Sequence, residues 1–191
     1  MDIAIYGGTF DPPTRAHEYI AEALSDSGLF DEVWIMPSAD RVDKPEMAPA
    51  VHREAMVRAM IANLQNSRIR FSNFEIDLGE PTQTVRTYAA LIEAHPNISF
   101  WFVFGADSYN DMPSWEGGDA LQKTLPMCVI PRFGHATPQD TANVHVLPVP
   151  QATELEVSST IVRQLARYNG DINGYVSDNV KSYVLQHALY A

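Results

Sequence analysis

The amino-acid sequence predicts an α/β fold in which an open parallel sheet carries helices on both faces and a helical tail follows the last strand. Three observations lead to this expectation. Short strand-like runs alternate with longer stretches of helical periodicity, which is typical of a parallel sheet with right-handed crossovers. Residues 98–104 are almost wholly apolar, as expected of a central strand covered on both faces. The last two expected helices, at 158–168 and 178–188, follow all the strands.

The first half of the chain contains three of the expected strands. They are the runs at 3–6, 32–37 and 69–72. Apolar residues at helical spacing predict a helix that begins at Thr14 and stops at Gly28, and a second helix over 51–64. The stretch 38–49 is polar, contains proline and lacks periodicity, so we expect a long loop there.

The second half supplies the other strands. A helix over 84–95 precedes the central strand, a fifth strand is expected at 126–131, and a weaker sixth at 144–147. No internal repeat, low-complexity tract or linker divides the sequence. We therefore expect one domain over residues 1–191.

The composition is that of a globular protein, with 46% apolar and 19% charged residues in a chain of 191. No basic segment with a long apolar run opens the chain, so we expect a cytoplasmic protein that does not enter a membrane. The single cysteine, Cys128, lies in an apolar run and is expected to be a buried thiol of the core.

The formal net charge of −11 argues against broad binding to nucleic acid, which requires a basic face. Any phosphate site must therefore be local. The basic side chains beside loops and glycines become candidates for anion contacts, namely Arg15, Lys44, Arg53, Arg132 and Arg163.

Residues 3–17, which read IAIYGGTFDPPTRAH, indicate a strand, a loop of phosphate size and a helix start. Paired glycines let backbone amides approach a ligand, and the free amides at a helix N-terminus favour an anion. The stretch lacks the glycine motifs of dinucleotide-binding folds and of P-loops. Thr14 and His17 are three residues apart, so we expect both side chains on one side of the first helical turn, facing one anion.

Ligands of an open parallel sheet bind beyond the carboxyl ends of its strands. The segments after those ends are 7–17, 37–44, 105–107 and Arg132. The histidines other than His17 show no spacing typical of metal ligands, so no zinc site is expected.

Several segments together resemble the nucleotidylyltransferase superfamily, which implies a Rossmann-like sheet. They are 7–17, Gly-Ala-Asp at 105–107, and Ser-Ser-Thr-Ile-Val-Arg at 158–163. Residues 105–108 with Trp115, 129–134 and 178–190 are similar to bacterial nicotinate mononucleotide adenylyltransferases. The resemblance therefore covers nearly the whole chain.

The resemblance implies that the phosphate of a pyridine mononucleotide attacks the α-phosphate of ATP and that pyrophosphate leaves. The protein then aligns two polyanions and supplies no nucleophile. By resemblance, His17, Thr14 and Arg163 are catalytic. ATP contacts are implied for Gly7, Gly8, Thr9, Phe10, Gly105, Asp107, Ser158, Ser159 and Thr160, and acceptor contacts for Lys44, Thr84, Trp115 and Arg132. Mg²⁺ is expected to arrive bound to ATP, and the family is compatible with a homo-oligomer.

The first helix departs from the family pattern H-x-G-H, because this chain reads Thr14-Arg15-Ala16-His17. Thr14 is similar to the variant in phosphopantetheine adenylyltransferases, where a hydroxyl can serve as a phosphate donor. We expect the methyl group of Ala16 to tighten the helix against the path of the phosphate.

Three hypotheses stay open on these residues. Overall similarity favours nicotinate mononucleotide over nicotinamide mononucleotide as acceptor, although Gln83 and Arg86 replace an aromatic and an acidic residue of the family. A sister transferase that acts on another phosphorylated acceptor, such as phosphopantetheine, agrees with Thr14. A nucleotide-binding module without turnover agrees with Ala16 and with the changed segment at 82–88.

Overall fold

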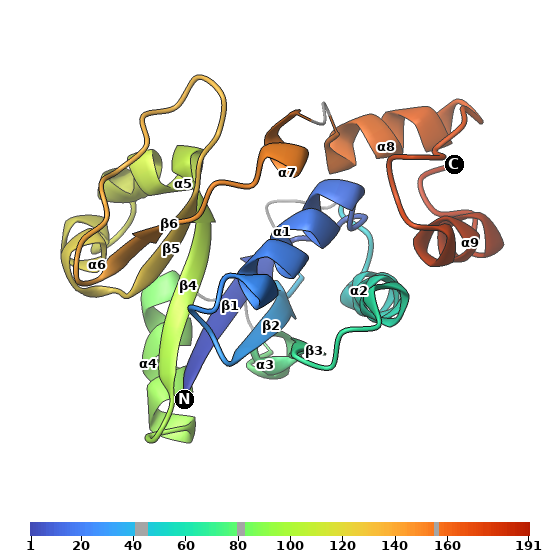
Figure 1. The fold of residues 1–191 in the computed structure, drawn as a ribbon. Coiled ribbons are helices and arrows are strands. Elements are labelled where there is room, and N and C mark those ends of the chain that lie inside the picture. Colours follow the sequence, from blue (N-terminus) through green and yellow to red (C-terminus); the bar gives the residue numbers. More distant parts are fainter. Residues whose placement is uncertain (41–45, 80–82, 155–156) are drawn as a thin grey trace.

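Six strands form one parallel sheet in the computed structural model (Figure 1), in the order β3-β2-β1-β4-β5-β6. The structure describes residues 1–40, 46–79, 83–154 and 157–191. The strands are β1 (Asp2–Gly8), β2 (Glu32–Pro37), β3 (Ile69–Phe71), β4 (Ser99–Gly105), β5 (Met127–Ile130) and β6 (Val144–Val146). The predicted open parallel sheet is confirmed, and its strand order is that of doubly wound nucleotide-binding sheets.

Helices connect the strands and form the C-terminal tail. The longer ones are α1 (Arg15–Asp26), α2 (Ala50–Leu64), α4 (Thr84–Ala94), α8 (Ser159–Arg167) and α9 (Asp178–Gln186). The shorter ones are α3 (Phe74–Asp77), α5 (Ala106–Asp111), the 3₁₀ turn η1 (Met112–Ser114), α6 (Gly118–Thr124) and α7 (Pro150–Glu154). The predicted helical tail after the sheet is confirmed by α8 and α9.

Both faces of the sheet are covered, because side chains alternate along the buried strand β1. Ala4 and Tyr6 belong to an apolar cluster that includes residues of α1, α2, α8 and α9. Ile3 and Ile5 belong to a second cluster, with residues of α4, α6 and η1. Burying a large aliphatic side chain contributes about 1.5–3 kcal/mol, so these two cores hold the strand ends in place.

The C-terminal tail packs on the α1 and α2 side of the sheet. Val162 of α8 and Val180 and Val184 of α9 are buried in the same cluster as Met56 and Val57 of α2. In Figure 1, α9 lies beside α2, and the C-terminus lies close to α8. The end of the chain is thereby brought near the loop that follows β1.

The short helices were not expected from the sequence. Helices α3, α5, α6 and α7 have four to seven residues, which is too short to show an apolar period and depends on tertiary packing for stability. The first strand also extends through Gly7 and Gly8, so the paired glycines end the strand instead of forming the turn.

Two further expectations concern the single cysteine and membrane-spanning helices. Cys128 is fully buried, as predicted, and burial raises the pKa of its thiol to about 12. Among the described helices, none is both long and apolar enough to span a bilayer.

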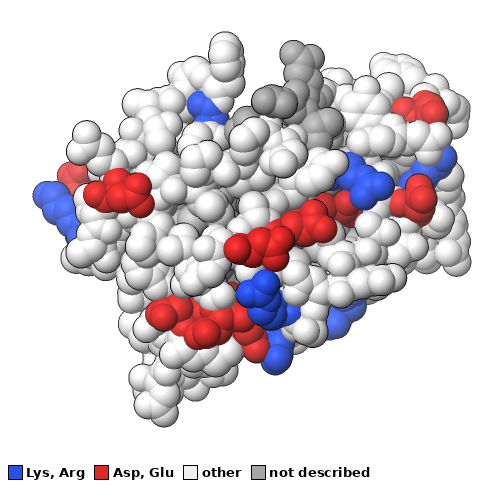
Figure 2. Space-filling view, viewed as in Figure 1, with Lys and Arg blue, Asp and Glu red and all other residues white. Residues whose placement is uncertain are grey.

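Charged side chains of both signs are interspersed on the face shown in Figure 2. Acidic side chains run along α1 in the middle of this view. Partial burial, together with the neighbouring carboxylates of Glu18 and Asp26, raises the pKa of Glu22. The net charge of −11 thus includes an acidic stripe on the outer side of α1.

Candidate active site

The loop that joins β1 to α1 lies at the carboxyl edge of the sheet, where the strand order reverses. β1 sits between β2 and β4, so its end and the end of β4 flank the crevice in which such sheets bind ligands. Thr14 is the N-cap of α1 and is buried, with 1% of its surface exposed. The start of α1 faces this edge, although the backbone N–H groups of Arg15, His17 and Glu18 donate to the carbonyls of Tyr175 and Thr14.

The ring of His17 is held by the N-cap residue of its own helix. The backbone N–H of Thr14 donates to Nδ1 of His17 at 2.9 Å, and Oγ1 of Thr14 lies 2.8 Å from the same nitrogen. The imidazole thus occupies the place that a glutamate takes in a capping box. Because a backbone N–H can only donate, Nδ1 is unprotonated and the ring proton of the neutral form lies on Nε2.

His17 is neutral at physiological pH. Burial, with a smaller contribution from the positive charge of Arg132, lowers the pKa of His17 to about 4. The ring can therefore donate a hydrogen bond from Nε2 to an anion without carrying a charge of its own.

Two aromatic rings support the imidazole. The ring centroid of Phe10 lies 5.1 Å from that of His17, and the centroid of Tyr6 lies 5.6 Å from that of Phe10. Phe10 has a φ of 51° and folds back over Gly8, where an added Cβ would lie 3.2 Å from the Phe10 ring. Phe10 is only 2% exposed, so its ring is part of the core, and its ATP contact stays a prediction.

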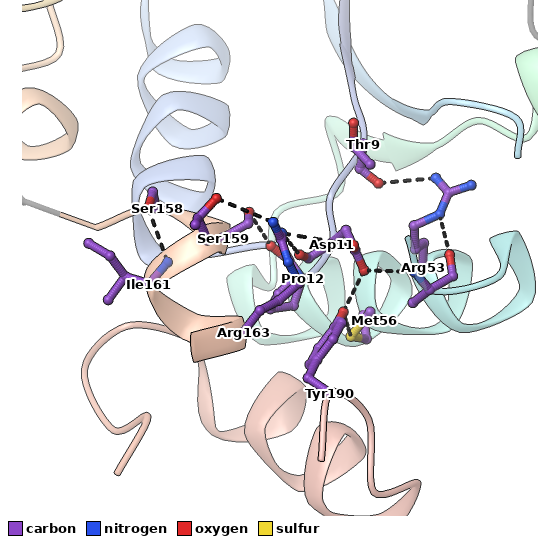
Figure 3. A network of polar contacts seen from close by, with 12 residues as sticks. Thr9, Asp11, Pro12, Arg53, Met56, Ser158, Ser159, Ile161, Arg163 and Tyr190 are labelled. Carbon is purple, nitrogen blue, oxygen red and sulfur yellow. Dashed lines mark hydrogen bonds and ion pairs between the residues drawn. The ribbon is translucent and has the colours of Figure 1, made fainter. Parts of the chain in front are cut away.

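Four carbonyl groups, at the end of β1 and in the loop after it, accept hydrogen bonds from other parts of the chain, and Figure 3 shows those of Thr9, Asp11 and Pro12. They are those of Gly8 (from Ser38 N–H, 2.9 Å), Thr9 (from Arg53 Nη1, 3.1 Å), Asp11 (from Arg163 Nη1, 2.7 Å) and Pro12 (from Ser159 Oγ, 2.8 Å). The carbonyl oxygens, which are the negative ends of the peptide dipoles, are thus paired with N–H and O–H groups of the protein. This arrangement lowers the electrostatic cost of bringing a polyanion to the loop.

Arg53 is a structural residue of α2. Its side chain is fully buried, and its guanidinium donates to the carbonyls of Ala48 (2.9 Å) and Thr9 (3.1 Å) and to Asp40 Oδ1 (2.9 Å). The expectation that Arg53 contacts a bound anion is therefore wrong, because its guanidinium is fully enclosed and serves these three protein groups.

The start of α8 is attached to the same loop, although the two segments are far apart in the sequence. Oγ of Ser158 caps the helix by accepting from the N–H of Ile161 at 3.3 Å, and the hydroxyl of Ser159 donates to Pro12. Arg163 donates to the carbonyl of Asp11 from Nη1 and to Oγ1 of Thr160, at 3.3 Å, from Nη2. The structure thus brings the predicted residues of α8 to the loop that contains Thr14.

A cleft of about 450 Å³ opens on the outer side of this junction. Thr160 and Arg163 line it, together with Arg167, residues 46–49 and the C-terminal residues 188–191. His17 and Asp107 are not among its lining residues. Arg163 therefore lies between this cleft and the loop.

Gly105, Asp107 and Arg132 meet at the ends of β4 and β5. A Cβ on Gly105 would overlap Oδ1 of Asp107 and would lie 2.9 Å from Nε of Arg132, so a larger residue here would displace these two side chains. Nε of Arg132 lies 3.9 Å from Oδ1 of Asp107. The charge of Arg132 also acts on His17, which indicates that these predicted residues share one electrostatic environment.

Two residues predicted to bind the acceptor lie in segments that touch each other. Gln83, the N-cap of α4, donates from Nε2 to Glu116 Oε2 at 2.6 Å, and these residues adjoin Thr84 and Trp115. The Trp115 ring packs edge-on against Phe104, with centroids 6.0 Å apart, beside the end of β4. Lys44, also predicted to bind the acceptor, lies outside the described residues.

The neighbours of Thr14 in the first helical turn have structural partners. Arg15 forms an ion pair with Glu18 at 2.7 Å, and its proposed anion contact has to compete with this carboxylate. Ala16 is 7% exposed and packs in the cluster with Ile20. The methyl group therefore belongs to the core, and a tightening of the helix against the phosphate path stays a prediction.

Asp11 and Tyr190 are the polar residues of this region that sequence reasoning missed. Asp11 is 4% exposed and accepts a hydrogen bond from the hydroxyl of Tyr190 at 2.7 Å. In the sequence, an aspartate directly before two prolines indicates a turn and does not indicate a buried carboxylate. Its partner could not be found from spacing, because it lies 179 residues away.

Within residues 1–40, 46–79, 83–154 and 157–191, no three His, Cys, Asp or Glu side chains gather closely enough to hold an ion. Oδ1 of Asp107, however, is buried and has no hydrogen-bond partner. Such an oxygen fits a ligand hydroxyl or a magnesium ion that is held mainly by substrate phosphates.

Comparisons with known proteins point to one family. The family model described as cytidylyltransferase-like matches residues 5–165. A probable nicotinate-nucleotide adenylyltransferase of Salinibacter ruber is 31% identical and covers 100% of this chain and 98% of the relative. One of a Synechococcus strain is 34% identical and covers 98% and 96%. The solved structure of Plasmodium falciparum nicotinic acid mononucleotide adenylyltransferase complexed with NaAD is 27% identical, with a TM-score of 0.85 and coverage of 99% and 97%.

Proposed function

The chain belongs to the cytidylyltransferase-like family, and from this membership we propose that it is an adenylyltransferase of the nicotinate-nucleotide type. It joins the AMP moiety of ATP to nicotinate mononucleotide and releases pyrophosphate, a step in the synthesis of NAD. Relatives with this name match the chain over almost its full length at 31–34% identity.

The observation that carries the proposal is the arrangement around the loop after β1. A neutral His17 is fixed with Nε2 as its only donor, and the N-terminal end of α8 is bonded to the same loop. The N-terminus of α8 and the neutral Nε2 donor of His17, both beside the end of β1, suit a polyphosphate.

In the proposed reaction, a phosphate oxygen of the mononucleotide attacks the α-phosphorus of ATP. The bond between that phosphorus and the oxygen bridging to the β-phosphate breaks, and pyrophosphate leaves with the electron pair. The attacking phosphate is already ionised near neutral pH, so the work of the protein is alignment and charge stabilisation.

Each group of residues then has one role. Nε2 of His17 donates to the α-phosphate, while Thr14 holds the other ring nitrogen. Amides of the loop, with the hydroxyls and amides at the start of α8 and with Arg163, bind the β- and γ-phosphates. Asp107 would help to hold a Mg²⁺ ion that arrives with ATP, and this ion would supply positive charge beside the phosphates.

The acceptor is placed at the edge formed by β4 and β5. Trp115, packed on Phe104, offers an aromatic face for a pyridine ring. Arg132 is 47% exposed at its side chain and can bind the acceptor phosphate or the nicotinate carboxylate. Thr84, at the start of α4, offers a hydroxyl and a helix N-terminus to the same anion.

A pyrophosphate-release screen tests this function. Purified protein with MgATP is given nicotinate mononucleotide, nicotinamide mononucleotide or phosphopantetheine in separate reactions. We expect the highest kcat/KM with nicotinate mononucleotide. Release with phosphopantetheine alone would identify a sister transferase, and tight ATP binding without release on any acceptor would identify a module without turnover.

A further inference from the structure

We propose that Tyr190, the penultimate residue, is a positioning residue for ATP, because its hydroxyl holds the Asp11 carboxylate away from Arg163. The inference deepens the proposed function and rests on it. Tyr190 acts through Asp11 and does not itself touch a substrate.

The Asp11 carboxylate lies at the centre of the polar network in Figure 3. Its Oδ1 accepts from the Tyr190 hydroxyl at 2.7 Å and from the backbone N–H of Ala48 at 3.3 Å. Its Oδ2 lies 3.8 Å from Nη1 of Arg163, and the same nitrogen donates to the Asp11 carbonyl at 2.7 Å. The carboxylate is thus turned toward Tyr190 and Ala48, and its approach to Arg163 is an ion pair beyond hydrogen-bond distance.

Contacts of the C-terminal segment with α9 and α2 hold the Tyr190 hydroxyl beside Asp11. The backbone N–H of Leu189 donates to the carbonyl of Val184 at 3.0 Å, which ties the segment to α9. The Tyr190 hydroxyl also lies 3.9 Å from Sδ of Met56 on α2. Burial and the charge of Asp11 raise the pKa of Tyr190, so its hydroxyl keeps the proton that it donates.

The position of the Asp11 carboxylate decides how well Arg163 can bind a phosphate group. A guanidinium that is fully paired with a carboxylate is a weaker ligand for a triphosphate, because the two anions compete for the same donors. With the Tyr190 hydroxyl in place, Oδ1 of Asp11 accepts hydrogen bonds from Tyr190 and from Ala48. Without it, a buried carboxylate that has lost a partner moves to the nearby cation. Tyr190 thereby leaves the N–H groups of Arg163 that do not bond the Asp11 carbonyl or Thr160 available for phosphate.

The test is Tyr190→Phe, which removes the hydroxyl and keeps the ring. ATP binding is measured by calorimetry without any acceptor, and steady-state kinetics are measured with nicotinate mononucleotide. We expect the Kd and the KM for ATP to rise about tenfold, as for the loss of one hydrogen bond to a charged group. The KM for the mononucleotide is expected to stay within about twofold.

Tyr183→Phe is the matched control. Its hydroxyl lies 3.1 Å from Nδ1 of His52, between α9 and α2 and away from the loop. We expect this variant to bind ATP like the wild type. A loss of ATP affinity in both variants, with lower thermal stability in both, would show a merely structural role of the C-terminal tyrosines and overturn the inference.

A double variant distinguishes competition by the Asp11 charge from a general loss of folding. In Tyr190→Phe combined with Asp11→Asn, the competing charge is removed, so ATP affinity is expected to recover relative to Tyr190→Phe alone. Unchanged ATP affinity in Tyr190→Phe, or no recovery in the double variant, contradicts the inference. A wild-type protein that binds ATP but forms no dinucleotide contradicts the proposed function instead, and the binding comparison still decides the role of Tyr190.

Discussion

At the scale of single residues, the N-cap residue of α1 fixes the orientation and the tautomer of the His17 imidazole. The spacing of Thr14 and His17 predicted that both face one anion. In the structure, the backbone N–H and Oγ1 of Thr14 contact Nδ1 of His17. Thr14 therefore orients the imidazole, and Nε2 of His17 is left to face the anion. Sequence spacing gave no means to distinguish two side chains that bind one ligand from one side chain that orients the other.

Removing the imidazole tests the role of His17. For His17→Ala we expect kcat/KM for ATP to fall about 10²–10³-fold, as when one preorganised donor to a developing charge is lost. His187→Ala, which removes an exposed imidazole on the C-terminal segment, is the control and should keep the wild-type rate. A His17→Ala variant with wild-type turnover would show that the donor to the α-phosphate is another group.

The depressed pKa of His17 predicts how stability depends on pH. The unfolded ring titrates near 6.5 and the folded ring near 4, so the unfolded state binds more protons between these values. Stability from this group is therefore fully present above pH 6.5 and is lost as the pH falls toward 4. Between pH 7.5 and pH 5 we expect wild type to lose about 2 kcal/mol of unfolding free energy relative to His17→Gln.

Urea unfolding of both proteins at the two pH values measures this difference. Other titrating groups are common to wild type and variant, so they cancel in the comparison. An equal pH dependence in the two proteins would show that the folded ring titrates at its ordinary pKa.

At the scale of elements, the loop after β1 is held by α2 on one side and by α8 on the other. Arg53 of α2 and Arg163 of α8 each bond a loop carbonyl. The sequence indicated both arginines as candidate anion contacts. Burial separates them, because Arg53 is fully enclosed whereas the Arg163 side chain is 35% exposed.

Replacing Arg53 tests the α2 anchor. Arg53→Met leaves the carbonyls of Thr9 and Ala48 and the carboxylate of Asp40 without their donor, and we expect a loss of about 3–5 kcal/mol of unfolding free energy. Arg58→Met is the control on the same helix. Arg58 pairs with Glu54 at the surface and lies over the Phe71 ring, so about 1 kcal/mol is expected.

Denaturant unfolding of the two variants gives the comparison. Equal losses for Arg53→Met and Arg58→Met would mean that the buried guanidinium contributes no more than an exposed one.

The long elements could be predicted because their patterns are strong. The apolar run at 98–104 indicated the central strand β4, and Gly28, with a φ of 72°, stops α1 as its position predicted. The segment between β4 and β5 could not be predicted, because α5, η1 and α6 are short and are formed by packing. Gly118 shows this dependence, since a Cβ there would overlap the backbone of Met112.

At the scale of the whole molecule, the topology brings the start of α8 and the C-terminal segment to the loop that follows the first strand. The motif at 158–163 could be assigned to phosphate binding by resemblance, and the structure places it against Asp11 and Pro12. The contact of Tyr190 with Asp11 has no local signal in the sequence. Such long-range polar pairs depend on strand order and helix docking, which periodicity does not encode.

The central claim is that the protein aligns ATP and a pyridine mononucleotide for direct attack and forms no bond to either. The most direct measurement is the stoichiometry of products, by chromatography, in reactions with MgATP alone and with MgATP plus nicotinate mononucleotide. We expect equal amounts of dinucleotide and pyrophosphate with both substrates, and no pyrophosphate from ATP alone. Pyrophosphate released without the acceptor, or ATP consumed without dinucleotide, would contradict the account.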